Sequence, residues 1–287
     1  MKVSGFTIVR NAVALDFPIV ESIRSILPIC DEVVVNAGRS DDGTLALIRT
    51  IADPKVRILE TEWDMSRGES VLRDETRRAM EACRYPWGVY IQADEVLHET
   101  GAGELRRTIE SVAEDPAVEG VAVRYRHLFG DPSTEAVSRK WYRREVRAVR
   151  LEPAYGVHPF RDAQGFRVGP ADRKIRARLS NAEMFHYGYV RAGFALRGRV
   201  AADRALYPAR DQPEGDRAVL HWFPGLRPFR GTHPAVAREW LAARANDPDR
   251  RVTPRAFRLA HLRIYLSNLF ERLTGLRPFE FRNYELV

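Results

Sequence analysis

The sequence predicts an α/β fold in which a mixed, mainly parallel sheet is flanked by helices. Short apolar runs of strand-forming residues recur at 3–9, 33–35, 56–59 and 88–91, and the segments between them carry apolar residues at helical spacing. Residues 33–35 are three consecutive valines, which is typical of a strand covered on both faces. Since parallel strands need a crossover connection between them, this alternation indicates a parallel sheet.

The first helix is expected between the strand at 3–9 and Pro28. Asp16 offers an N-cap, and Pro18 suits the first turn of a helix. Ile19 and Ile23 then lie on one face. Pro28 is expected to end the helix, because proline lacks the backbone donor and clashes with the preceding turn.

The same spacing predicts further helices at 45–51, 68–83 and 104–113. The pattern changes after the last of these. Residues 120–127 and 141–150 are strand-like with no long helix between them, which indicates antiparallel strands in the second half of the sheet.

From about residue 190 the chain is expected to be helical and rich in arginine. We therefore expect two parts, an α/β domain at 1–190 and a helical extension at 191–287 packed on it. The last helix is expected to begin at Thr253 and Pro254 and to end at Gly275. Within it leucines recur at steps of three and four, at Leu259, Leu262, Leu266, Leu269 and Leu273.

The composition is that of a globular protein. Hydrophobic residues make up 45% and charged residues 30% of the 287, which excludes a mostly disordered chain, a collagen-like repeat and a disulfide scaffold. Cys30 and Cys83 show no metal spacing and are expected to be small buried residues. No apolar run approaches the ~18 residues of a membrane helix, so the expected location is cytoplasmic, with the inner face of the membrane as an alternative.

The net charge of +7 comes almost entirely from arginine. Only four lysines occur, so 42 of the 46 cationic residues are arginine. Codon bias in GC-rich DNA explains such usage, and so does a phosphate-bearing partner, because a guanidinium binds phosphate with two parallel hydrogen bonds. The charge predicts an anionic partner without choosing its class.

Polar clusters follow three of the predicted strands: Arg10-Asn11, residues 40–44, and Asp94-Glu95. Ligands of open α/β sheets bind at the carboxyl ends of strands. Carboxylates there can accept hydrogen bonds from a base or ribose, or hold a divalent cation. We therefore expect Asp41, Asp42 and Asp94 to share one cavity.

Other nucleotide-binding and hydrolase motifs are missing from the sequence. None of the four lysines follows a glycine, so there is no phosphate loop ending in Gly-Lys-Ser/Thr. Gly101 and Gly103 lack the third glycine of a dinucleotide-binding loop, and no Gly-x-Ser-x-Gly segment exists. Kinase, dehydrogenase and serine-hydrolase interpretations are therefore not favoured.

Several segments, in this order and spacing, resemble family 2 glycosyltransferases with the GT-A fold. The resemblance covers roughly residues 1–190 and is greatest to the branch that adds sugars to lipopolysaccharide core and similar surface glycans. The segments are Phe6-Thr7-Ile8-Val9-Arg10-Asn11, Ser40-Asp41-Asp42-Gly43-Thr44, Arg67-Gly68, Arg73-Asp74, Tyr90-Ile91-Gln92-Ala93-Asp94-Glu95, Trp141-Tyr142, Val157-His158 and His186-Tyr187-Gly188-Tyr189.

The resemblance implies an inverting transfer of a hexosyl group from a nucleotide-sugar donor to a hydroxyl of a saccharide, lipid-linked or small-molecule acceptor. It implies that Asp94, with His186, holds Mg²⁺ or Mn²⁺ bridging the diphosphate, which is the leaving group. The remaining donor contacts that it implies are Thr7, Val9, Arg10, Asn11, Asp41 and Asp42 at the base and ribose, and Arg67 and Arg73 at the diphosphate.

Two positions depart from the family pattern. Gln92 replaces the first aspartate of the Asp-x-Asp motif, so one anionic metal ligand becomes neutral. Pro159 follows His158 where many relatives have glutamate, so the usual base for the acceptor hydroxyl is missing. Asp162 and His158 are the nearest candidates for this base, and Asp131 and Glu145 are further ones.

The partners of the remaining features stay open at this level. The leucine-rich helix, with Arg255, Arg258, Arg263 and Arg272 beside it, suits packing on the main domain, a homodimer face or a peripheral contact with an anionic membrane. No nucleic-acid partner is expected. The competing functions are a sugar-1-phosphate nucleotidyltransferase, whose glycine-rich opening loop is absent, and a non-catalytic arginine-rich protein that binds polyanions.

Overall fold

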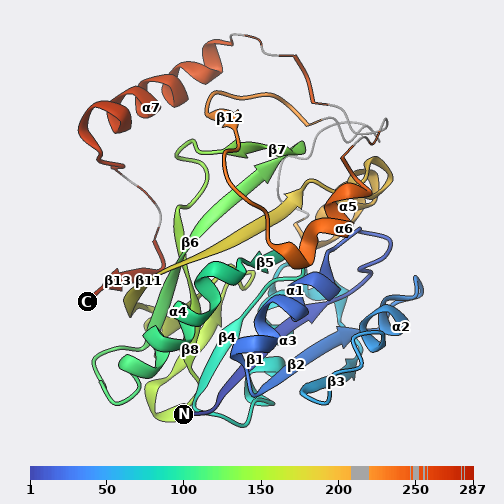
Figure 1. Cartoon of the computed structure of the whole chain (residues 1–287), viewed down its shortest axis with the longest axis vertical. Coiled ribbons are helices and arrows are strands. Elements are labelled where there is room, and N and C mark those ends of the chain that lie inside the picture. The colour runs from blue at the N-terminus through green and yellow to red at the C-terminus, as the bar shows by residue number, and fades with distance from the viewer. Residues whose placement is uncertain are drawn as a thin grey trace.

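The described part of the chain forms one thirteen-stranded mixed sheet with helices on both faces (Figure 1). The computed structural model describes residues 1–207, 220–245, 247, 252–254, 256, 258–278, 280 and 282–287. The main path of the sheet runs β3-β2-β1-β4-β8-β6-β11-β10-β9. These strands are β1 (Val3–Val9), β2 (Glu32–Gly38), β3 (Val56–Thr61), β4 (Trp87–Tyr90), β6 (Gly120–Phe129), β8 (Arg144–Arg150), β9 (Val157–Phe160), β10 (Gly165–Val168) and β11 (Arg173–Tyr189).

The first four strands are parallel to one another, and β8 then pairs antiparallel with β4. β6 is antiparallel to β8 and parallel to the long strand β11. The predicted fold class, a mixed α/β sheet flanked by helices, is therefore confirmed, as are the antiparallel strands of the second half.

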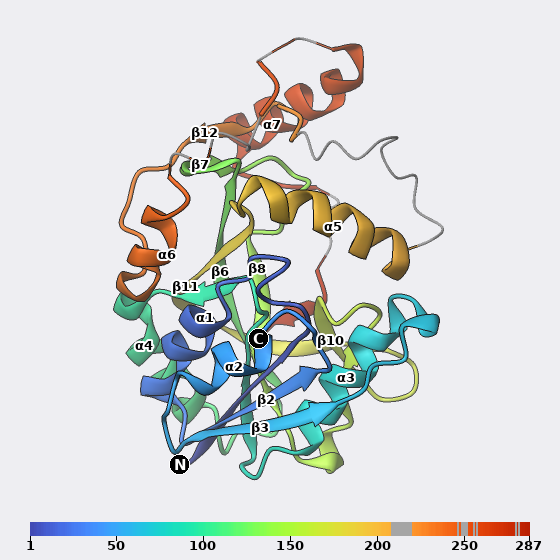
Figure 2. The same cartoon turned by 90° about the vertical axis from the view of Figure 1, so that its right-hand side faces the viewer.

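Both faces of the parallel half are buried. Val33 and Val35 pack into the cluster that contains α1 and α4, whereas Val34 packs into the cluster with α3 on the other face. Figure 2 shows α1 and α4 on one side of the strands and α3 on the other. The helices are α1 (Ile19–Ile26), α2 (Thr44–Arg49), α3 (Ser70–Glu81), α4 (Glu99–Ser111), α5 (Gly193–Leu206), α6 (Arg238–Ala242) and α7 (Leu262–Thr274).

Short strands that the sequence did not reveal complete the sheet. β5 and β13 pair with β11, and β7 joins β6 to β12. The chain after residue 190 thus contributes helices together with two strands, and its last strand joins the main sheet. These four strands are β5 (Glu95–Leu97), β7 (Asp131–Ala136), β12 (Leu226–Pro228) and β13 (Tyr284–Leu286).

One predicted N-cap and one predicted helix start were wrong. Asp16 does not cap α1, whose N-cap is Pro18, because the Asp16 carboxylate instead accepts a hydrogen bond from the Ala192 amide at 2.7 Å and pairs with Arg244. The last helix begins at Leu262 and not at Thr253. The Thr253 amide donates to the Leu220 carbonyl at 2.9 Å, next to an isolated parallel bridge between Leu220 and Val252.

The predicted end of α7 is confirmed, since Gly275 follows the helix with a left-handed φ of 69°. In both views α7 lies at the end of the molecule remote from β2 and β3 (Figures 1 and 2). Among the described residues, no helix has the length and apolar character needed to cross a membrane.

Two glycines of α4 have opposite surroundings. A Cβ on Gly101 would lie 2.7 Å from the Cα of Ala182 in β11, whereas one on Gly103 would meet only the end of the Arg107 side chain at 3.5 Å. Gly101→Ala should therefore destabilise the protein by about 1–3 kcal/mol through overpacking. Gly103→Ala should stabilise it by about 0.5–1 kcal/mol through lower chain entropy. Urea unfolding measures both, and equal changes in the two variants would contradict this packing.

Candidate active site

A cavity of about 570 Å³, called here the Asp94 cavity, opens where β1 and β4 end. These strands are adjacent and parallel, so their carboxyl ends lie at the same edge of the sheet. The end of β1 contributes Val9, Arg10 and Asn11, and the turn after β4 contributes Gln92 and Asp94. The opposite wall comes from β11, α5 and the loop that precedes β8.

Asp94 is surrounded by cationic and imidazole groups. Its Oδ2 accepts a hydrogen bond from Arg191 Nη2 at 2.9 Å and lies 3.5 Å from His186 Nε2. Burial acts to raise the pKa of Asp94, but His186 and two arginines hold that pKa well below its usual range. The carboxylate is therefore ionised at neutral pH.

A hydrogen bond between two histidines, His127 and His186, orients the His186 ring beside Asp94. His127 Nε2 lies 2.8 Å from the Tyr142 carbonyl, which only accepts, so this nitrogen carries a hydrogen. Burial and then the neighbouring His186 lower the pKa of His127 well below its usual range, so its Nδ1 is a free acceptor. That atom lies 3.3 Å from Nδ1 of His186, which therefore donates. His186 Nε2 is left facing Asp94.

Two arginines, the buried Arg191 and the partly buried Arg199, add positive charge to the cavity. Arg191 stands 4.1 Å over the ring of Phe17, and Arg199 of α5 stands 4.2 Å over that of Tyr189. Burial and then the charge of Arg199 lower the pKa of Arg191 to about 10, which leaves it charged at neutral pH. Both line the cavity, which therefore suits an anionic ligand.

Asp162 lines the same cavity from the loop between β9 and β10. Its Oδ2 accepts a hydrogen bond from the Tyr207 hydroxyl at 2.9 Å. Arg161 and Ala163, on either side, have left-handed φ angles of 51° and 58°, a conformation that non-glycine residues adopt at a cost. Gln92 Nε2 lies 3.4 Å from the Ala163 carbonyl, so the residue that replaces the first motif aspartate approaches this loop.

A fully buried ion pair supports the turn that carries Asp94. Arg147 of β8 donates to both carboxylate oxygens of Glu95, at 2.9 and 2.8 Å, and neither side chain is exposed. The same carboxylate accepts from the Tyr125 hydroxyl at 2.6 Å and from the Gln92 amide at 3.0 Å. The pair therefore ties β8 and β6 to the start of the 92–94 turn.

The expectation that Asp41, Asp42 and Asp94 share one cavity was wrong, because only Asp94 lines it. Asp41 is exposed, and Asp42 Oδ2 accepts from the Ala14 amide at 2.8 Å. Burial acts to raise the pKa of Asp42, but hydrogen bonds from Ala14 and Thr44 hold it below its usual value. The 40–44 cluster shapes the loop after β1 through its hydrogen bonds to that loop's amides.

The other residues predicted to contact the donor lie in different parts of the structure. Thr7 is fully buried and does not line the cavity, in contrast to the predicted contacts Val9, Arg10 and Asn11. Arg73 and His158 line a second cleft of about 690 Å³, where His158 Nε2 lies 2.9 Å from Asp172. Arg67 lines neither and pairs with Asp74 at 2.8 Å.

The two further base candidates lie outside the Asp94 cavity. Asp131 accepts hydrogen bonds from Ser133 at the start of β7, at 2.7 and 2.6 Å. Glu145 is buried and accepts from Asn283 at 2.9 Å, and burial raises its pKa. Their contacts are those of residues that hold the fold.

Sequence reasoning missed Arg191, Arg199 and the partner of His186, His127. No local motif marks them, because each reaches the cavity only through the position of β11 beside β6 and β5. The sequence did contain one indication of these residues. In the segment from His186 to Arg199, aromatic and cationic side chains follow one another at the end of a strand.

Asp94 and the imidazole beside it could supply two ligands to a divalent cation. One carboxylate and one imidazole nitrogen, 3.5 Å apart, face each other, and the second nitrogen of that imidazole is held by a hydrogen bond, as in most metal-binding histidines. A side chain on Gly188 would lie 2.7 Å from both groups, so glycine keeps the space between them open. Among the described residues no group of three or more His, Cys, Asp or Glu could hold a metal. The remaining ligands would have to be diphosphate and water oxygens.

Comparisons with known proteins give only distant similarities. No protein-family model and no curated protein matches the chain. Among solved structures, S. aureus TarS (residues 1–349) is 11% identical, with a TM-score of 0.43 over 70% of this chain and 65% of that one. Glucosyl-3-phosphoglycerate synthase from Mycobacterium tuberculosis is 17% identical, with a TM-score of 0.31 over 44% of this chain and 43% of that one. The chain thus covers less than two thirds of either relative, and these values do not establish its family or activity.

The Glu95–Arg147 pair should dominate the stability of the site. Arg147→Met leaves a buried carboxylate unpaired and should lower the free energy of unfolding by about 3–5 kcal/mol. The control is Arg49→Met, which removes an exposed ion pair with Glu60 and should cost less than about 1 kcal/mol. Guanidinium unfolding measures both, and a similar small loss in the two variants would show that the buried pair is not needed.

Proposed function

We propose that the chain is an inverting glycosyltransferase that moves a hexosyl group from a nucleoside diphosphate donor to a hydroxyl acceptor in the Asp94 cavity. The observation that carries the proposal is the charge arrangement there. An ionised carboxylate, an imidazole and two guanidinium groups, one of them buried, meet at the carboxyl ends of β1 and β4. Such a site suits a diphosphate bridged to a cation, with the base and ribose near Arg10 and Asn11.

The bond to the leaving group is the one that this site activates. The acceptor oxygen attacks the anomeric carbon, the bond from that carbon to the diphosphate oxygen breaks, and the electron pair leaves with the diphosphate. Arg191 and Arg199 stabilise the charge that develops on it. A single displacement of this kind inverts the anomeric centre. A divalent cation held by Asp94 and His186 supplies further neutralising charge when bound.

Asp162 is the proposed base that takes the acceptor proton. It is a carboxylate in the same cavity as Asp94, and the Tyr207 hydroxyl orients it. His158, the alternative, lies in the second cleft and pairs with Asp172, away from the donor groups. A base must come within hydrogen-bond reach of the hydroxyl that attacks, which favours Asp162.

The donor proposal predicts a metal-linked nucleotide response. UDP, GDP or dTDP should raise the unfolding midpoint, and Mn²⁺ should add to the shift only with nucleotide present, because two side chains alone make a weak site. At 100 times Kd a ligand stabilises by about 2.7 kcal/mol. Asp94→Asn should lose the Mn²⁺-dependent part, and Asp172→Asn should keep it. Differential scanning fluorimetry measures these shifts, and an unchanged response in Asp94→Asn would refute the assignment.

The base proposal predicts a loss of turnover without a loss of binding. Asp162→Asn should reduce release of nucleoside diphosphate from a nucleotide sugar by about 10²–10⁴-fold, the usual range for a general base, while the nucleotide shift stays the same. Asp172→Asn, which removes the partner of His158, should keep its turnover. The opposite pattern would move the base to His158.

The competing functions give different products in the same assay. A sugar-1-phosphate nucleotidyltransferase would form pyrophosphate from a nucleoside triphosphate, with no nucleoside diphosphate released. A polyanion-binding protein would turn over neither substrate and would bind with a steep salt dependence.

A further inference from the structure

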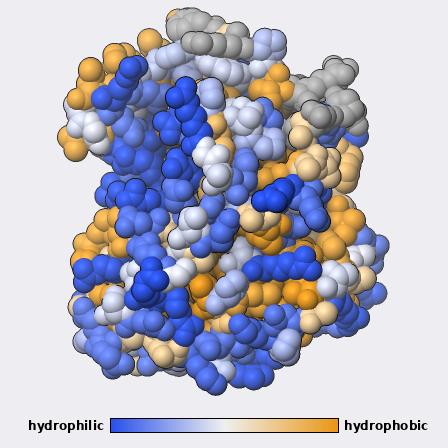
Figure 3. Space-filling model, in the orientation of Figure 1, coloured by the Kyte–Doolittle hydropathy of each residue, from blue (hydrophilic) through white to orange (hydrophobic). Residues whose placement is uncertain are grey.

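Helix α7 carries its apolar stripe on the outside of the molecule. Ile264, on the face toward the protein, is 7% exposed, whereas Leu266 and Leu273 are 57% and 75% exposed. At 3.6 residues per turn, the outer leucines project within about 60° of one another. Figure 3 shows apolar side chains gathered at this end of the molecule. The stripe consists of Leu262, Leu266, Leu269 and Leu273.

The face of α7 toward the protein is largely polar. Asn268 and Glu271, which lie four and seven residues after Ile264, line a cleft between the helix and the sheet. Glu271 accepts from Arg143 at 3.3 Å and from Arg277 at 2.8 Å. A surface helix of a globular protein normally buries its apolar face, so this orientation is inverted.

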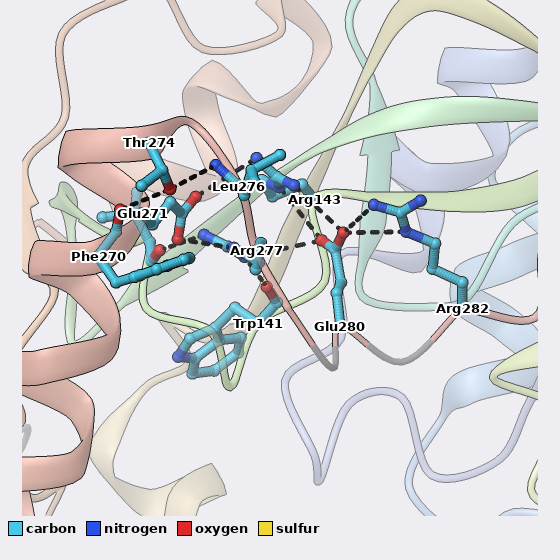
Figure 4. Close-up of polar contacts among 10 residues, drawn as sticks. Trp141, Arg143, Phe270, Glu271, Thr274, Leu276, Arg277, Glu280 and Arg282 are labelled. Carbon is cyan, nitrogen blue, oxygen red and sulfur yellow. Dashed lines mark hydrogen bonds and ion pairs between the residues drawn. The ribbon is translucent and has the colours of Figure 1, made fainter.

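A buried polar anchor fixes that orientation (Figure 4). The Arg277 side chain is 3% exposed and donates to the Trp141 and Val137 carbonyls, each at 2.8 Å. Arg143 donates to both oxygens of Glu280 at 3.2 Å. Rotating the helix to bury its leucines would pull Glu271 away from Arg143 and from the buried Arg277, so the outward stripe is a property of the fold.

The exposed charges beside the stripe are all positive. Glu271 is the only acidic residue between positions 258 and 278, and the anchor neutralises it. Arg263 and Arg272 are exposed and, by helical geometry, project about 80–100° to either side of the leucines. Arg258 is also exposed, just before the helix. Arg255 lies outside the described residues.

We propose that the outer face of α7 binds the surface of an anionic phospholipid bilayer. The leucines enter the boundary between headgroups and acyl chains, and the flanking arginines contact lipid phosphates. A second copy of the chain is a poorer occupant, because its own arginines would face these.

The anchor that holds α7 lies beside the proposed active site. Trp141, whose carbonyl the anchor holds, also lines the Asp94 cavity. On the proposed function, a lipid-linked acceptor would therefore reach the cavity from this membrane face. Bilayer binding needs no turnover, so its failure and the failure of the transfer activity are distinguishable.

The test is co-sedimentation of the full chain with vesicles of phosphatidylcholine alone or with about 30% phosphatidylglycerol. The wild type should bind the anionic vesicles, with an affinity that falls as salt is raised. Leu266→Ser with Leu273→Ser should weaken binding about tenfold or more, and Arg263→Ala with Arg272→Ala should remove the preference for anionic lipid. The matched controls are Phe194→Ser, an exposed apolar residue on α5, and Arg24→Ala, an exposed arginine on α1. Both should bind like the wild type.

Two results would overturn the proposal. One is equal binding by the leucine variant and the wild type, with unfolding midpoints showing that both are folded. The other is a dimer in lipid-free solution, measured by analytical ultracentrifugation, that the leucine variant dissociates, since a second copy would then cover the stripe. A wild-type monomer that binds anionic vesicles through α7 supports it.

Discussion

The position of the candidate active site depends on the buried pair of Glu95 and Arg147. Two charges without solvent are tolerated only when each is fully paired, so the bidentate contact fixes β8 against the end of β4. Because Tyr125 and the Gln92 amide bind the same carboxylate, β6 and the 92–94 turn are held by it as well. The turn is therefore placed by an interaction deep in the sheet and not by the cavity that it borders.

The cavity carries more positive than negative charge around Asp94. Asp94 faces Arg191 and His186, and the rings of Phe17 and Tyr189 lie against the two guanidinium groups, which limits their contact with water. Charges held in this way interact more strongly with a ligand than exposed ones. A diphosphate entering such a site meets cations already in place, so the protein need not reorganise around it.

The sequence predicted the parts of this site that follow from the parallel sheet. Asn11 and Asp94 line one cavity because each follows a strand, and those strands are neighbours. The same reasoning failed for Asp42, because its carboxylate binds the backbone amide of Ala14, and a local hydrogen bond of this kind leaves no periodic signal. Arg191 could not be predicted, since its contact with Asp94 spans 97 positions and depends on the place of β11 in the sheet.

Helix α7 shows a different limit of sequence patterns. The leucine spacing predicts an amphipathic helix with one apolar face. Such a face is expected to point inward because burial removes apolar side chains from water. The contacts of Glu271 override this expectation, since its partner Arg277 is itself held by two backbone carbonyls on the protein side of the helix. Desolvating a guanidinium is tolerated only with its partners in place, whereas an exposed leucine costs far less. The polar contacts therefore determine which face of α7 is buried. The apolar stripe remains exposed on the outer face, where it can bind another surface.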